Sequence, residues 1–221
     1  MIFVRFAYRI VLSSTSPMTA SELFGNSEQL KFYSNFIALT WRYAHHGNSR
    51  PNTGVRMELK ELTDRTFELF GVDSPDNLGS ALLENISNAD KLKAFCDLVD
   101  GDLSIDWMQM IYQYYLADRK EKKQDYTPKS LARFMGMLAG DGETITDMCA
   151  GSGALIIQKW NQNHDMEFRA IEIDSNVIPF LLFNMVLRNI RCDIYQMDAL
   201  TDEEPTKTWT VEKREVFGCI T

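Results

Sequence analysis

The sequence feature that most constrains the fold is one glycine-containing stretch, Thr144-Ile-Thr-Asp147-Met-Cys149-Ala150-Gly151-Ser-Gly153-Ala-Leu-Ile-Ile157. It begins with a β-branched run that ends in an acid, continues through small residues and two glycines, and becomes apolar again. Glycine has no Cβ, so two glycines allow a sharp turn and a close approach of a ligand to the backbone. The stretch therefore predicts a strand, a tight loop and the start of a helix, which together present backbone N–H groups to a ligand.

The same stretch limits which ligand would fit. A dinucleotide fingerprint needs a third glycine three residues after the second, but residue 156 is Ile. Asp147 at the strand end would also repel a pyrophosphate. An acid in this place suits a positively charged ligand, such as the amino group and sulfonium of S-adenosylmethionine. The alternative is an ordinary strand–helix turn that contains two glycines.

The glycine stretch resembles the cofactor motif of the adenine-N6 DNA methyltransferases, in the form used by modification subunits of type I restriction systems. The segment Tyr126-Thr127-Pro128 resembles the one that precedes the cofactor strand in this family and forms a wall around the methionine end of the cofactor. The resemblance implies that S-adenosylmethionine is held by Asp147, Cys149, Ala150, Gly151 and Gly153, with Tyr126, Thr127 and Pro128 beside it.

A second predicted strand, residues 167–174, also ends in acids. Glu172 lies 25 positions after Asp147, which is the length of one strand–helix–strand unit. A carboxylate at this strand end can accept hydrogen bonds from both ribose hydroxyls of an adenosine. The family resemblance of Ile-Glu172-Ile173-Asp174 supports this role for Glu172 and places Ile173 at the cofactor, while Asp174 is expected to cap the next helix. The alternative is an acid that simply ends a strand at the surface.

A third predicted strand, residues 192–197, leads into Asp198-Ala199-Leu200. The resemblance implies that Asp198 accepts a hydrogen bond from the adenine amine, with Ala199 and Leu200 beside the ring. Three acids would then follow three consecutive strands, and ligands of open α/β sheets bind at the carboxyl ends of strands.

The chain is expected to have three parts. Residues 1–20 are expected to be a flexible arm, with Met18 as an alternative start, and residues 21–123 a helical domain. Residues 124–221 are expected to be the S-adenosylmethionine-binding domain, truncated relative to complete enzymes. The predicted fold class is α/β, a Rossmann-like methyltransferase fold with a partial sheet preceded by a helical domain. The tail, residues 215–221, is expected to supply at most a fourth strand, and it is expected to cover the last sheet edge unless a homodimer buries it.

Helix boundaries in the first half are indicated by capping residues. Gly71 is expected to end a helix, and Ser74 followed by Pro to begin the next one. Asn88 and Ser104 are expected to cap two more helices, the second over residues 105–119.

Composition limits the partners. The net charge of −8 argues against strong binding to DNA by this chain alone, because such binding depends on many Lys and Arg contacts to phosphates. A DNA enzyme of this composition would need a local basic face or a basic partner, and the family resemblance implies a specificity or restriction subunit as a candidate partner, beside a possible homodimer. The four cysteines show no CxxC spacing, which favours a reduced, cytoplasmic protein without a metal site. No apolar stretch is long enough to suggest a membrane segment.

The sequence lacks the family's catalytic feature. In this family an Asn/Asp-Pro-Pro-Tyr/Phe loop accepts hydrogen bonds from the amine of the target adenine in DNA. These 221 residues contain no Pro-Pro pair. We therefore assign no catalytic residue. The leading interpretation is a DNA adenine-N6 methyltransferase, and the main alternative is a non-catalytic S-adenosylmethionine-binding or decoy subunit of a restriction-modification complex. A methyltransferase that acts on a small molecule or a protein is a third possibility.

Overall fold

The computed structural model describes residues 11–12, 58–115, 129–139, 144–201 and 203–221. In this part of the chain, one six-stranded sheet has the strand order β1-β2-β3-β4-β5-β6. The strands are β1 (Val11–Leu12), β2 (Thr144–Asp147), β3 (Glu167–Glu172), β4 (Cys192–Gln196), β5 (Lys207–Glu212) and β6 (Cys219–Ile220). The helices are α4 (Leu59–Phe70), α5 (Pro75–Glu84), α6 (Ala89–Leu98), α7 (Trp107–Tyr115), α8 (Lys129–Leu138), α9 (Ala154–Trp160) and α10 (Ile178–Leu187).

The centre of the sheet is parallel. Strands β2, β3 and β4 run in the same direction, and β1 and β5 flank them in the antiparallel sense. Burial alternates along β2, β3 and β4, so one face of these strands is more deeply buried than the other. Ile145, Phe168, Cys192 and Val211 are cross-strand partners, and all four are buried. This row fixes the register, since a slip by one residue would turn these side chains to the other face.

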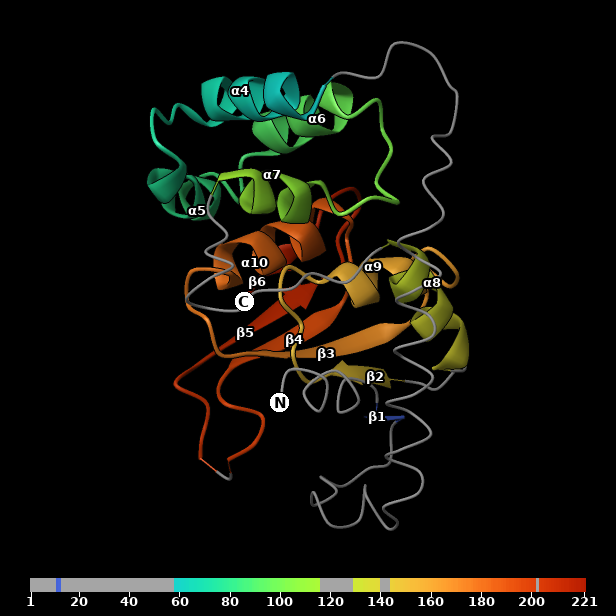
Figure 1. Ribbon diagram of the computed structural model, residues 1–221. Helices are drawn as coiled ribbons and strands as arrows, with labels where there is room; N and C mark the ends of the chain where they lie inside the picture. The colour runs from blue at the N-terminus through green and yellow to red at the C-terminus, as the bar shows by residue number, and fades with distance from the viewer. Residues whose placement is uncertain (1–10, 13–57, 116–128, 140–143, 202) are drawn as a thin grey trace.

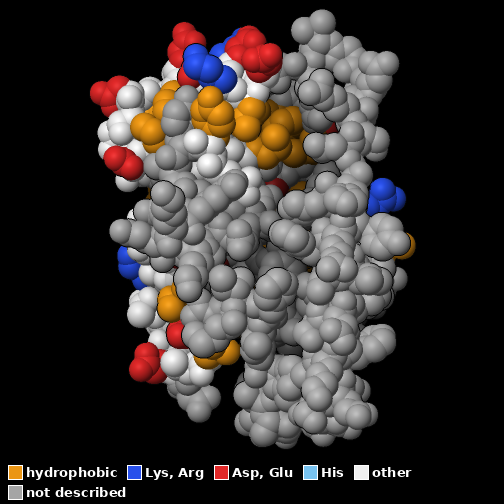
Figure 2. All heavy atoms as spheres, in the orientation of Figure 1, with side chains coloured by type: hydrophobic (Ala, Val, Ile, Leu, Met, Phe, Trp, Pro, Cys, Tyr) orange, Lys and Arg blue, Asp and Glu red, His pale blue; other side chains and the backbone are white. Residues whose placement is uncertain are grey.

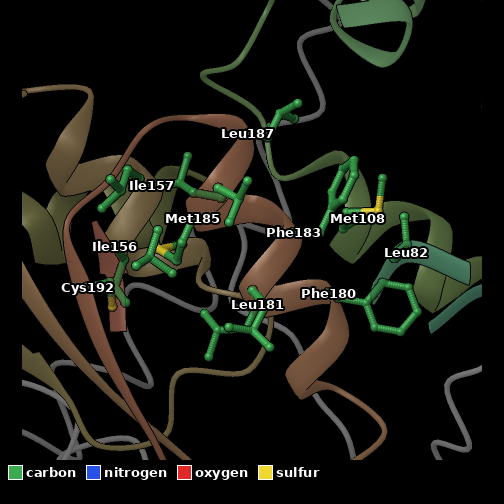
Figure 3. Packing of buried hydrophobic residues seen from close by; sticks show 14 of the residues in the cluster. Leu82, Met108, Ile156, Ile157, Phe180, Leu181, Phe183, Met185, Leu187 and Cys192 are labelled. Carbon is green, nitrogen blue, oxygen red and sulfur yellow. The ribbon is translucent and has the colours of Figure 1, made fainter. Parts of the chain in front are cut away.

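Helix α10 lies between the sheet and the helices α4–α7 of the first half of the chain (Figure 1). It is buried along its whole length, from Ile178 to Leu187. A helix that is apolar on all sides must be covered on all sides. The sheet covers one side and the layer formed by α4–α7 covers the other, while α8 packs on α9 at the end of the sheet (Figure 1). Figure 3 shows Phe180 and Phe183 of α10 directed toward the α4–α7 layer, near Leu82 and Met108.

Three of the four predicted capping sites in the first half are confirmed. Gly71 ends α4 in the left-handed conformation with φ 71°, and the Ser74 and Asn88 side chains accept hydrogen bonds from N–H groups at the starts of α5 and α6. Ser104 is not the cap of α7. Asp106 takes that place, because its Oδ1 accepts the Gln109 N–H at 2.9 Å, whereas the Ser104 hydroxyl donates to Asp102 at 2.6 Å.

The chain after Asp198 forms more of the sheet than a single strand at residues 215–221. β5 pairs antiparallel with β4, and the two-residue β6 pairs with β5. Asn189 fixes this tail: its side chain donates to the Arg214 carbonyl at 2.6 Å and accepts the Arg214 N–H at 2.8 Å. The outer strand on this side is short, which limits the unpaired edge.

The α4–α7 layer shares one hydrophobic core with the sheet. Phe183 of α10 makes edge-to-face contacts with Phe70 of α4 and Phe95 of α6, at centroid distances of 5.5 Å and 5.4 Å. Figure 2 shows acidic and basic side chains along the outer side of this layer, as expected of amphipathic helices with one buried face. The division at residue 123 into two domains stays a prediction.

Candidate cofactor-binding site

Backbone hydrogen bonds bring the three predicted strand ends together. The Ala150 N–H, in the loop after β2, donates to the Ile171 carbonyl in β3 at 2.9 Å. The Met197 N–H, after β4, donates to the Glu172 carbonyl at 3.1 Å. Because Asp198 follows Met197 directly, the residues predicted to contact the cofactor after β2, β3 and β4 lie along one edge of the sheet.

The glycine loop has the conformation that its sequence predicts. Gly151 and Gly153 have φ values of 57° and 96°, in the region that residues with a side chain rarely adopt. The Gly153 N–H donates to the Ala150 carbonyl at 2.9 Å, which closes the turn. The Gly153 carbonyl then accepts the Ile157 N–H at 2.9 Å, so α9 begins without a break.

Glu172 is joined directly to this loop. Its Oε2 accepts the Gly151 N–H at 2.8 Å, and its Oε1 accepts the N–H groups of Ile173 and Asp174 at 2.9 Å and 2.8 Å. Hydrogen bonds to a charged acceptor are stronger than those between neutral groups. The carboxylate is therefore held at the junction of β2 and β3, where a ribose would approach it. The contact with Gly151 could not be read from the sequence.

Asp147 is placed differently from the sequence-based expectation of direct ligand contact. Its side chain is only 2% exposed, and its Oδ1 accepts the Cys149 N–H at 3.2 Å. The Asp147 carboxylate therefore stabilises the turn from its buried side. Its negative charge still lies at the end of β2, where it favours a cationic ligand.

Ile173, predicted to lie at the cofactor, follows β3, and the residues predicted to contact adenine, Asp198, Ala199 and Leu200, follow β4. Asp198 is half-buried, and its Oδ1 accepts the Leu200 N–H at 3.0 Å, which orders the turn that contains Ala199. Ile173 and Leu200 are each 57% exposed. Large apolar side chains on a cofactor edge suit the faces of an aromatic ring. Their contact with the adenosine part of S-adenosylmethionine stays a prediction.

Two further predictions concern the residues before α8 and Asp174. Tyr126, Thr127 and Pro128 lie outside the described residues, and α8 begins directly after them, at Lys129. Asp174 caps the turn before α10, because its Oδ1 accepts the Asn176 N–H at 2.9 Å, but it does not cap the helix itself. Within the described ranges, no group of three His, Cys, Asp or Glu residues could hold a metal ion. The same ranges include no helix with the length and apolar character needed to cross a membrane.

Sequence reasoning missed a buried polar cluster behind the loop. Asp106 Oδ2 accepts the Ser152 hydroxyl at 2.7 Å, and Asp106 Oδ1 accepts the Asn184 amide at 2.8 Å. Arg188 donates to Asn184 Oδ1 at 2.8 Å. The only sequence signal is a polar Asn184 inside an apolar helical run and a charged Arg188 at the end of that run.

Burial shifts the acid–base properties of this cluster. It raises the pKa of the Asp106 carboxyl, and the nearby positive charge of Arg188 opposes that rise. Burial also lowers the pKa of the Arg188 guanidinium to about 10, against the opposing effect of Asp106. The pair is held in place because its polar atoms are hydrogen-bonded, which buried charges require.

Comparison with known proteins identifies the class. The family model for N-6 DNA methylases matches residues 103–216, just over half of the chain, so the chain belongs to this family. Membership confirms the family and the Rossmann-like fold class predicted from the glycine motif. The matched range includes α7 and the loop before it as well as the three strand ends.

One solved structure is also similar. It is a proposed class I S-adenosylmethionine-dependent methyltransferase of Listeria monocytogenes, with 15% sequence identity and a TM-score of 0.42. The match covers 65% of this chain and 55% of that one, so the chain spans about half of the solved protein. No curated protein matches the chain.

Proposed function

We propose that this chain binds S-adenosylmethionine at the carboxyl ends of β2, β3 and β4, and that it serves the transfer of a methyl group to the N6 amine of adenine in DNA. The observation that carries the proposal is the 2.8 Å hydrogen bond from the Gly151 N–H to Glu172. It joins the glycine loop of β2 to the carboxylate of β3, which are the two parts of an adenosine-binding crevice. When bound, the cofactor supplies an activated methyl group.

Each residue along this edge has a distinct proposed task. Glu172 accepts hydrogen bonds from the ribose hydroxyls of the cofactor, and Asp198 accepts a hydrogen bond from the amine of its adenine. Ile173 and Leu200 cover the faces of the ring. Asp147, fixed beneath the turn, adds negative potential for the cationic sulfonium. The catalytic contribution of these groups is to hold the methyl group in position, since orientation alone can supply a large part of a rate enhancement.

The proposal predicts a large effect of Glu172→Gln on cofactor affinity. The affinity of this variant for S-adenosylmethionine should fall about 30- to 100-fold, because hydrogen bonds to a charged acceptor contribute about 1.5–3 kcal/mol. An amide would also place an N–H group beside either the Gly151 N–H or those of Ile173 and Asp174. Isothermal titration calorimetry of the purified variant measures this change.

Glu167→Gln is the matched control. Glu167 lies at the opposite end of β3, where it pairs with Arg191 at 2.9 Å and is about half exposed. Its substitution should leave the affinity for S-adenosylmethionine unchanged. Equal affinities for wild type and Glu172→Gln would contradict the placement of the ribose at Glu172.

The DNA substrate is proposed from the family and from chemistry. Enzymes that modify a base take it out of the stack, and much of their DNA affinity comes from phosphate contacts. With a net charge of −8, this chain should bind DNA weakly by itself. We propose that it acts in the cytoplasm with a homodimer mate or a specificity or restriction subunit. Nanomolar affinity of the isolated chain for DNA at physiological salt would contradict this.

A second candidate function is a non-catalytic S-adenosylmethionine-binding subunit. The observation that favours it is the lack of a Pro-Pro pair in the 221 residues, since the family's acceptor loop contains one. Purification of the chain from its natural host distinguishes the two candidates. A co-purifying subunit that carries its own Asn-Pro-Pro loop would support the non-catalytic function.

A further inference from the structure

The loop before α7, residues 102–106, is a polar junction between the α4–α7 layer and the methyltransferase fold. Its backbone carbonyls accept hydrogen bonds from two different helices of that fold. Arg188 of α10 donates to the carbonyls of Leu103 and Ile105 at 2.9 Å and 2.7 Å. Gln158 of α9 donates to the Ser104 carbonyl at 2.8 Å. The loop is thus fixed against both helices that flank the glycine loop.

Asp106 extends this junction to the glycine loop itself. Its Oδ2 accepts the Ser152 hydroxyl at 2.7 Å, while Oδ1 accepts from Asn184 at 2.8 Å and from the Gln109 N–H at 2.9 Å. Asn184 also donates to the Ser152 carbonyl at 2.8 Å. Asp106, Ser152 and Asn184 are all at least 94% buried. Both the side chain and the carbonyl of Ser152 are therefore held from the side of α7 and α10.

Two carboxylates therefore accept hydrogen bonds from two adjacent residues of the glycine loop. Glu172 holds the Gly151 N–H from the strand side, and Asp106 holds the Ser152 hydroxyl from the helix side. Gly151 and Gly153, which flank Ser152, have positive φ values that glycine adopts easily but does not enforce. A loop with two glycines loses much conformational freedom when it is ordered, so fixed partners are needed to keep it in one conformation.

We propose that Asp106 is a positioning residue for cofactor binding: it holds the glycine loop, through Ser152, in the conformation that receives S-adenosylmethionine. This inference rests on the proposed function. Asp106 lies behind the loop and acts through Ser152. A cofactor meeting a preorganised loop avoids the free energy of ordering it, so affinity depends on this contact. The α4–α7 layer thereby takes part in cofactor binding without contributing a group to the site.

The test separates affinity from stability with two substitutions. Ser152→Ala removes the contact with the loop, and we expect about a tenfold loss of affinity for S-adenosylmethionine. Asp106→Asn keeps the geometry, because Oδ1 still accepts from Asn184 and Gln109 while the new amide donates to the Ser152 hydroxyl. The affinity of Asp106→Asn for S-adenosylmethionine should stay within about threefold of wild type. Its unfolding midpoint should nevertheless fall further than that of Ser152→Ala, because the substitution removes the negative charge beside the buried Arg188.

Asn88→Ala is the control for a stability loss alone. Asn88 caps α6 by accepting the Lys91 N–H at 3.2 Å, far from the loop in sequence and in fold. Its unfolding midpoint should fall, while its affinity for the cofactor should not change. Affinities that follow the unfolding midpoints across the three variants would overturn the proposal, as would wild-type affinity in Ser152→Ala.

Hydrogen exchange of the cofactor-free proteins provides a readout independent of the proposed function. Amides of residues 148–153 should exchange faster in Ser152→Ala than in wild type and should stay protected in Asp106→Asn. Unchanged exchange in Ser152→Ala would overturn the role of Asp106. If wild type fails to bind S-adenosylmethionine, the proposed function fails and so does the effect on affinity, whereas faster exchange would still show that Asp106 holds the loop.

Discussion

Replacement of Gly153 by Ala is expected to lower the free energy of unfolding by about 2–4 kcal/mol, because two unfavourable effects combine. The backbone at this residue has φ 96°, which an L-side chain adopts only with strain. A Cβ would also lie 2.7 Å from Met185 Cε and 3.0 Å from Leu181 Cδ1. Both neighbours belong to α10 and are fully buried in the hydrophobic core, which leaves them little space to move (Figure 3). Urea denaturation followed by circular dichroism measures the loss.

Gly71→Ala is the matched control, because it separates backbone strain from crowding. Gly71 also has a left-handed backbone, with φ 71°, but a Cβ there would meet no atom within 4 Å. We expect a loss of about 1 kcal/mol from the backbone conformation alone. Equal losses for the two substitutions would show that the glycine loop is not packed tightly against α10.

The second large effect is expected for Phe183→Ala, with a loss of about 3–5 kcal/mol in the free energy of unfolding. Phe183 is fully buried and joins α10 to both Phe70 and Phe95 by edge-to-face contacts. Its removal leaves a cavity between the α4–α7 layer and the sheet. Urea denaturation monitored by tryptophan fluorescence and by circular dichroism should give one shared transition in wild type, because both layers share one core.

Leu83→Ala provides the comparison for Phe183. Leu83 lies in α5 and is 40% exposed, so its truncation should cost less than about 1 kcal/mol. Two separated transitions in the wild-type protein would contradict the shared core. They would instead support an independent helical domain.

The sequence predicted the parts of the fold that depend on neighbouring residues. Strands β2, β3 and β4 and the ends of α4, α5 and α6 follow from β-branched runs, Gly71, Ser74 and Asn88. Parallel strand order placed the site residues along one edge. The antiparallel β5 and β6 were predicted incompletely, because the pairing of Lys207–Glu212 with β4 joins segments that are separated by a loop.

Contacts between distant residues could not be predicted in the same way. The hydrogen bonds of Gly151 to Glu172 and of Ser152 to Asp106 join residues 21 and 46 positions apart. No local pattern encodes such pairs, because the first depends on how β2 and β3 lie side by side and the second on where α7 packs. For the same reason Ser104 was expected to cap α7, whereas Asp106 both caps this helix and reaches the glycine loop.

The edge formed by the glycine loop, Glu172 and Asp198 is the proposed binding site for S-adenosylmethionine. Equilibrium dialysis with S-adenosylmethionine labelled in its methyl group tests it most directly, with adenine-rich duplex and single-stranded DNA present in the same sample. At saturating cofactor we expect one labelled molecule per folded wild-type chain, and at a concentration near the wild-type Kd we expect Glu172→Gln to hold only a small fraction of the label that wild type holds. Label in the DNA would support the enzyme, and label held but never transferred would support the non-catalytic subunit. No label on the folded wild-type protein at saturating cofactor would contradict the account.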